Sequence, residues 1–107
     1  MKLTEAEFLG QVTELAAIYG WSWVHFRPAR TAHGWRTPVS GPLGAGWPDL
    51  VLVRDRVIFA ELKADDGRVR PEQAEVGAVL AAAGAEWHLW RPKDLLTLIV
   101  PTLSRRT

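Results

Sequence analysis

Two short apolar runs separated by three charged residues constrain the fold of this chain more than any other feature. Residues 49–53 and 57–63 flank the charged triplet 54–56. A connection of this length lets two such runs pair as an antiparallel hairpin. Register counted back from the turn places Asp49 opposite Glu61. The sequence therefore predicts two carboxylates facing one another near the open end of a hairpin.

The second run ends in Glu61-Leu62-Lys63. Because successive side chains of a strand point to opposite faces, Glu61 and Lys63 share a face and Leu62 turns to the other. Like charges placed directly opposite one another destabilise a sheet, whereas a hard divalent cation binds carboxylate oxygens. Asp49 and Glu61 are thus candidate metal ligands. In the alternative interpretation, Asp49 only follows a turn and Glu61 only pairs with Lys63.

The order and spacing of several short motifs resemble a known nuclease superfamily. Pro48-Asp49, then Glu61-Leu62-Lys63, then Gln73 ten residues later are similar to the PD-(D/E)XK nucleases. Within that superfamily the chain most resembles the VRR-NUC group, small phage and prophage nucleases related to archaeal Holliday junction resolvases. The likeness runs from about Thr4 to about Leu96, nearly the whole chain. Either short motif alone is common, but the combination is specific.

The resemblance implies a set of site residues. Those expected to be catalytic are Glu7, Asp49, Glu61, Lys63 and Gln73. Those expected to hold a metal are Asp49, Glu61, the Leu62 backbone carbonyl and Glu7. An all-oxygen ligand set suits Mg²⁺, for which Mn²⁺ can substitute. Lys63 would neutralise charge on a phosphate, and the Gln73 amide would reach the active site; otherwise each is an ordinary surface residue.

The choice of Glu7 depends on the first helix. Family members carry a glutamate early in this helix, and Glu7 lies beside the apolar stripe. Glu5 and Glu14 are competing candidates. Thr4 and Glu7 also have the spacing of a capping box, which explains Glu7 without any role in catalysis.

Positive charge is concentrated ahead of Asp49. The formal net charge is only +1, but no acidic residue occurs between Glu14 and Asp49. The residues of this segment expected to contact DNA phosphates are His25, Arg27, Arg30, His33 and Arg36. Phosphate contacts give affinity and salt dependence but little sequence discrimination. The same segment could instead be an ordinary solvated loop. Trp35 and Trp47 could stack on an unpaired base, although Trp47 could equally be a packing residue.

Hydrophobic periodicity and turn residues predict the element order α-β-β-β-α-β-α. We expect an α/β domain whose central mixed sheet is flanked by helices, as in the restriction-endonuclease-like core that the resemblance implies. The segment 27–47 has no clear period and is expected to be a long loop. The predicted helices are 4–19, 71–83 and 92–98, the predicted strands are 21–26, 49–53, 57–63 and 86–90, and 103–107 is expected to be a frayed tail.

Length and composition limit the class of protein. At 107 residues, the chain has room for one domain, 1–107, with one modest core. It contains no cysteine, which excludes disulfides and thiolate metal sites and fits the cytoplasm. No apolar run approaches the ~18 residues of a membrane span. The N-terminus lacks the apolar core of a signal peptide.

Together these features predict a Mg²⁺-dependent DNA endonuclease that hydrolyses phosphodiester bonds, with branched DNA such as a Holliday junction as the expected substrate. A chain with one active site needs a C2 homodimer to cut two symmetric strands. The expected partners are DNA and a second copy, with no membrane and no small-molecule substrate. Two alternatives remain open: a nuclease of the same fold acting on flaps, linear duplex or RNA, and a catalytically silent DNA-binding or scaffold subunit.

Overall fold

The computed structural model describes residues 2–26, 29–32, 34–36 and 39–106. Its regular elements follow the expected order, with an additional hairpin and several short helical turns. The helices are α1 (Glu5–Ile18), α2 (Pro71–Ala82) and α3 (Val100–Ser104), and a 3₁₀ turn, η1, spans Gly44–Gly46. The strands are β1 (Ser22–His25), β2 (Ala29–Thr31), β3 (Gly34–Arg36), β4 (Leu50–Val53), β5 (Val57–Leu62) and β6 (Glu86–Trp90).

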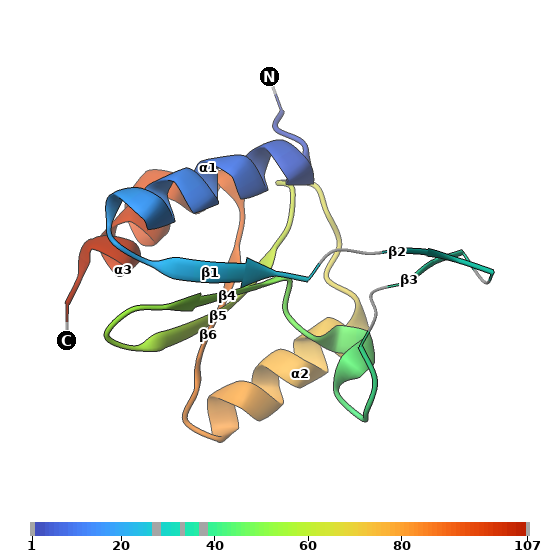
Figure 1. The fold of residues 1–107 in the computed structure, drawn as a ribbon. Coiled ribbons are helices and arrows are strands. Elements are labelled where there is room, and N and C mark those ends of the chain that lie inside the picture. The colour runs from blue at the N-terminus through green and yellow to red at the C-terminus, as the bar shows by residue number, and fades with distance from the viewer. Residues whose placement is uncertain (1, 27–28, 33, 37–38, 107) are drawn as a thin grey trace.

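The central sheet is mixed and four-stranded, in the order β1-β4-β5-β6. The pairs β1–β4 and β4–β5 are antiparallel, and β6 joins β5 in parallel through the α2 crossover. Helices α1 and α3 cover one face of the sheet, and α2 covers the other (Figure 1). The prediction of an α/β domain with a mixed sheet and flanking helices is therefore confirmed.

The predicted register of the β4–β5 hairpin is confirmed along the whole ladder. Val53 pairs with Val57 at the turn, and Leu50 pairs with Ala60 at the open end. One step further along both chains lies the position where Asp49 faces Glu61. The side chains of β5 also alternate as expected, because Ile58, Ala60 and Leu62 are fully or almost fully buried in one core cluster with α1 and α3.

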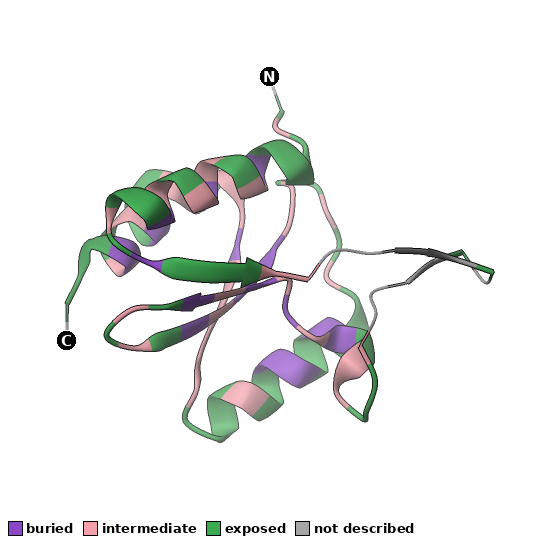
Figure 2. Cartoon of the chain, viewed as in Figure 1, coloured by how far each residue is buried: buried purple, intermediate pink, exposed green. Residues whose placement is uncertain are grey.

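The two faces of the sheet are packed differently (Figure 2). On the α1 and α3 face the core is aliphatic and aromatic, with Phe8, Val12, Ile99 and Leu103 fully buried. On the other face, α2 approaches the sheet closely because Gly77 has no side chain. A Cβ at that position would lie 2.5 Å from the Trp87 ring. The alanine-rich sequence of α2 fits this close contact.

The segment expected to be a long loop contains regular structure. Strands β2 and β3 pair as a small antiparallel hairpin in which Arg30 faces Trp35. This hairpin forms a separate two-stranded sheet that projects from the body of the domain (Figure 1). The prediction of a structureless loop is wrong here because a three-residue strand is too short to show a hydrophobic period.

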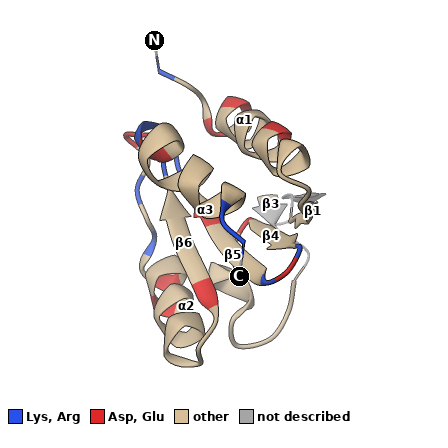
Figure 3. Cartoon of the chain, turned by 90° about the vertical axis from the view of Figure 1, so that its left-hand side faces the viewer, with Lys and Arg blue, Asp and Glu red and all other residues tan. Residues whose placement is uncertain are grey.

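The chain is packed as far as Ser104, which corrects the prediction of a frayed tail from residue 103; Thr107 lies outside the described residues. Helix α3 continues to Ser104, Leu103 is fully buried, and the Trp21 indole N–H donates to the Leu103 carbonyl at 2.8 Å. The charged turn between β4 and β5 lies beside this end of the chain (Figure 3). Long-range contacts of this kind leave no signal in the local sequence. Among the described residues, no helix has both the length and the apolarity that crossing a membrane requires.

Candidate active site

The candidate site lies at the open end of the β4–β5 hairpin, where the first turns of α1 and α2 also meet the sheet (Figure 1). Asp49 immediately precedes β4. Its Oδ2 accepts a hydrogen bond from the Leu62 backbone N–H at 3.1 Å, and its backbone carbonyl accepts one from Phe26 at 2.8 Å. These two bonds hold Asp49 between its neighbouring strands, beside the last residues of β5.

Glu61 is the most deeply buried charged residue of the site, with only 2% of its surface exposed. Its Oε2 lies 3.7 Å from the Lys63 ammonium group and accepts a hydrogen bond from the Gln73 amide at 2.8 Å. The expectation that Glu61 and Lys63 share a face is thus confirmed. Glu61 Oε1 is buried and accepts no hydrogen bond from a donor group of the described residues, and the Asp49 carboxylate can hydrogen-bond to Glu61 only through a shared proton. A buried carboxylate oxygen without a partner is uncommon and calls for a binding partner to explain it.

The surroundings of Glu61 disfavour its charged form. Burial is the main cause, and the Asp49 carboxylate adds to it by charge and by hydrogen bonding; together they raise the Glu61 pKa to about 8. Lys63 opposes this shift but does not cancel it. If both carboxyl groups were ionised, the site would need more positive charge than Lys63 supplies, and a bound cation would provide that charge.

Gln73 reaches this site from α2. It is the third residue of the helix, it is buried, and its Oε1 accepts the Arg70 backbone N–H at 2.9 Å. This second bond fixes the orientation of the amide, so that its NH₂ group points to Glu61. The close approach of α2 depends on Gly46, where a Cβ would lie 2.1 Å from the Glu72 carbonyl oxygen.

The first helix brings a different glutamate from the one expected. Glu7 forms the capping box: its Oε1 accepts the Thr4 N–H at 2.9 Å, and its own N–H donates to the Thr4 hydroxyl at 3.1 Å. These bonds lower the Glu7 pKa, and the side chain is exposed. Glu5 instead lines a cavity of about 220 Å³ together with Asp49 and His25. Partial burial and then the Asp49 charge raise the Glu5 pKa.

The structure therefore brings together Asp49, Glu61, Lys63 and Gln73, but leaves Glu7 outside the group. The capping box was visible in the sequence as a sign that Glu7 is already engaged. Nothing local, however, marks Glu5 as the helix residue that faces Asp49. This depends on how α1 is rotated on the sheet.

A divalent cation fits the chemistry of these residues. Within the described part of the chain, no group of three or more His, Cys, Asp or Glu side chains has the arrangement of a complete metal site. Mg²⁺, however, commonly uses one or two carboxylates and keeps several waters. Asp49 and Glu61 supply two carboxylates, and no donor group of the described residues occupies Glu61 Oε1, which leaves this oxygen able to bind a cation once the carboxyl group is ionised. The donor set contains no soft ligand, which favours Mg²⁺ or Mn²⁺.

The residues expected to contact DNA are spread over two regions. His25 lines the cavity beside Glu5 and Asp49. Arg30 and Arg36 lie in β2 and β3 of the projecting hairpin, where the structure describes only their backbone. Arg27 and His33 lie outside the described residues.

Two further basic residues, missed in the sequence, lie in the segment that connects Lys63 to α2. Arg68 and Arg70 are exposed, and Arg70 donates to the Ala45 carbonyl at 3.2 Å. Their position shortly after the catalytic-type Glu61-Leu62-Lys63 motif was the available signal. No protein-family model, curated protein or solved structure matches this chain. The function is therefore inferred from the site itself.

Proposed function

We propose that this chain is a Mg²⁺-dependent DNA endonuclease of the PD-(D/E)XK type, similar to the VRR-NUC group and with a restriction-endonuclease-like core. The observation that carries the proposal is the state of Glu61. It is buried opposite a second carboxylate, one of its oxygens accepts no hydrogen bond from a donor group of the described residues, and Lys63 lies 3.7 Å from the other oxygen. This arrangement lowers stability in the absence of a cation and is suited to phosphodiester hydrolysis.

Asp49, Glu61 and the backbone carbonyl of Leu62 would hold the metal, with Glu5 contributing from α1 in place of Glu7. When bound, the metal would polarise the scissile phosphate and lower the pKa of a water molecule toward neutrality. Glu61 is fixed for this task by Gln73, whose amide is itself held by Arg70. A ligand oriented by a second hydrogen-bonded residue binds a metal more tightly than a free one.

Lys63 would act on the phosphate. Its side chain is only 13% exposed and is held near Glu61, so its ammonium group is fixed in place before a substrate arrives. A fixed positive charge stabilises the negative charge that develops on the phosphate oxygens in the transition state. Hydrolysis would leave a 5′-phosphate and a 3′-hydroxyl, as the resemblance implies.

The proposed substrate class follows from the basic residues around the site and from the presence of one active site in each chain. The basic residues before Asp49, together with Arg68 and Arg70, would contact phosphates on either side of the site. With one active site for each chain, cutting both strands of a symmetric four-way junction requires a C2 homodimer. Branched DNA is therefore the proposed substrate class.

The test is a cleavage assay with the purified protein. Junction, flap, duplex and single-stranded DNA are incubated with Mg²⁺, Mn²⁺ or EDTA, using wild type, Asp49→Asn and the control Asp66→Asn. Asp66 is an exposed carboxylate whose only ion pair among the described residues is with Lys2. We expect cleavage by wild type and Asp66→Asn, and none by Asp49→Asn or in EDTA. Binding of junction DNA without cleavage of any substrate would favour the silent DNA-binding alternative.

A further inference from the structure

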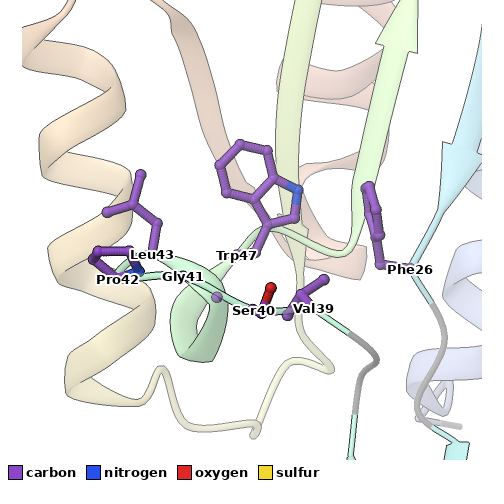
Figure 4. A pocket seen from close by; sticks show the side chains of 8 residues that line it. Phe26, Val39, Ser40, Gly41, Pro42, Leu43 and Trp47 are labelled. Atoms are coloured by element: carbon purple, nitrogen blue, oxygen red, sulfur yellow. The ribbon is translucent and has the colours of Figure 1, made fainter.

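A hydrophobic pocket of about 510 Å³ opens beside the candidate site (Figure 4). It lies between the end of β1 and the loop that leads into β4. None of the described residues that line it is charged. Its lining residues are Phe26, Val39, Ser40, Gly41, Pro42, Leu43, Gly44 and Trp47. The site proposed above uses none of these side chains.

The pocket lies on the same face of the sheet as Glu61. Trp47 makes an edge-on contact with Phe59, with ring centroids 5.7 Å apart. Phe59 and Glu61 are two residues apart on β5, so their side chains point to the same face. Phe26, on the opposite wall, donates its backbone N–H to the Asp49 carbonyl. The pocket and the two carboxylates are therefore adjacent.

The aromatic wall is fixed in position. Trp47 is packed edge-on against both Phe26, at 6.5 Å, and Phe59, with interplanar angles of 87° and 82°. Its backbone N–H donates to the Gly44 carbonyl, and the Gly44 N–H donates to Gly41. Gly41 adopts a φ of 97°, which a residue with a side chain rarely does. These turns hold the loop as one wall of the pocket.

The chemistry of the walls selects a flat, uncharged ligand. Among the lining residues, the only side-chain hydrogen-bonding groups are the Ser40 hydroxyl and the Trp47 indole N–H. Within the described residues, this indole N–H donates no hydrogen bond to the protein. The described lining residues offer no positive charge to a phosphate. A nucleobase offers an aromatic face for Trp47 and polar edges for the two hydrogen-bonding groups.

We propose that this pocket binds an unpaired nucleobase of the DNA whose phosphate occupies the Asp49–Glu61 site. The inference rests on the proposed function and narrows its substrate class, to DNA carrying an unpaired base beside the cleaved bond. In a paired duplex every base is stacked within the helix and none is available to the pocket. Branch points and bulges supply such a base at low cost, because it is already unpaired.

The test compares three DNA duplexes of one sequence: fully paired, with a single unpaired base, and with an abasic sugar at the same bulge. Dissociation constants are measured by fluorescence anisotropy in EDTA, and initial cleavage rates are measured in Mg²⁺. The abasic bulge keeps the bend and the phosphates but removes the base. We expect wild type to bind the base-containing bulge about 5- to 150-fold more tightly than the abasic one, the range of one base–aromatic stack.

Two variants test whether the pocket causes the preference for the base-containing bulge over the abasic one. Trp47→Leu should abolish it, and Ser40→Trp, which fills the mouth of the pocket from an exposed position, should do the same without touching the Trp47 packing. The matched control is Trp23→Leu, because Trp23 is an exposed tryptophan on β1 outside the pocket. Thermal unfolding identifies any variant that does not fold.

The outcomes separate this inference from the endonuclease proposal. Equal affinity for the two bulges, or no binding to either, overturns the inference, and so does a preference retained by folded Trp47→Leu and Ser40→Trp. Cleavage abolished by Asp49→Asn but insensitive to the base leaves the endonuclease proposal in place without the pocket. A base preference without cleavage supports the pocket and contradicts the endonuclease. A wild-type dimer that Ser40→Trp dissociates, with no base preference, would make the pocket a contact between copies.

Discussion

The two ends of the β4–β5 hairpin place charged side chains in opposite situations. At the turn, the Arg54 side chain is 8% exposed, and its guanidinium donates to Asp55, to two backbone carbonyls at 2.9 and 3.0 Å, and to the Arg105 carbonyl. At the open end, Glu61 is similarly buried but faces a second carboxylate, and one of its oxygens accepts no hydrogen bond from a donor group of the described residues.

The turn end is a complete structural cluster. Arg56 donates to Glu86 at 2.7 Å and to the Thr102 carbonyl at 2.7 Å. Both arginines lie over the Trp21 ring, at 4.4 Å for Arg54 and 5.0 Å for Arg56. Apart from the pairing with Asp55, these contacts join the hairpin to the segment that follows α1, to β6 and to the C-terminal segment. This end has the properties of a clamp that stabilises the fold.

The open end differs from the turn end in the way that a ligand-binding site is expected to differ from a stabilising cluster of the same residue types. Buried charges that serve stability are paired and fully hydrogen-bonded. At the open end, like charges meet and Lys63 offsets them only in part. A stability cost of this kind is expected where a ligand supplies the missing interaction. The following predictions test that difference.

The largest expected effect is the loss of cleavage in Lys63→Ala. Removing a fixed charge that stabilises the transition state should lower kcat by about 100-fold or more. DNA binding should remain, because affinity comes from phosphate contacts elsewhere. Gel-based cleavage rates and anisotropy measure the two properties separately. Cleavage at the wild-type rate would show that the open end is not the active site.

A pH-dependent loss of stability is expected next. Because the folded chain keeps the Glu61 proton up to about pH 8, whereas the ordinary pKa is 4.5, raising the pH between these values favours the unfolded state. In metal-free buffer, wild type should lose stability on the order of a few kcal/mol over this range, relative to Glu61→Gln. Urea denaturation at a series of pH values measures the difference. Parallel curves for the two proteins would contradict the buried-carboxylate interpretation.

Mg²⁺ should restore the stability that metal-free wild type loses as the pH rises. At pH 8, Mg²⁺ binds the folded state and should raise the melting temperature of wild type. It should have little effect on Glu61→Gln, which lacks one of the carboxylates. An equal rise in both proteins would locate the metal elsewhere.

A substitution at the turn end of the hairpin should lower stability without affecting cleavage. Arg54→Ala removes hydrogen bonds and the contact with Trp21, and should lower the free energy of unfolding by about 2 kcal/mol. Cleavage by the folded fraction should be unchanged. The exposed pair of Lys2 and Asp66 provides the control, because Lys2→Ala should hardly alter stability. A cleavage defect in folded Arg54→Ala would mean that the two ends are not independent.

The smallest effects should distinguish the two glutamates in the first turn of α1, Glu5 and Glu7. Glu5→Gln should raise the Mg²⁺ concentration needed for half-maximal cleavage by about 10-fold, because Glu5 lies beside Asp49. Glu7→Gln should leave metal dependence unchanged, since glutamine also completes a capping box. A Mg²⁺ titration of cleavage compares the two variants, and the reverse ranking would restore Glu7 as the third carboxylate.

Local geometry made the centre of the candidate site predictable from the sequence. The three-residue turn and the two-residue period of a strand set the partners of β4 and β5, and hence the meeting of Asp49, Glu61 and Lys63. The position of Gln73 in the first turn of α2 was likewise predicted from Pro71. These relations depend on covalent geometry and short-range hydrogen bonding, which act in the same way in any fold.

Tertiary structure decided the remaining features. Which glutamate of α1 faces Asp49 depends on the rotation of the helix on the sheet, which the packing of Phe8 and Val12 against the core fixes. The buried end at Leu103 and the pocket at Trp47 likewise arise from contacts between segments distant in the sequence. Such contacts depend on how whole elements dock, and no local period of the sequence records that arrangement.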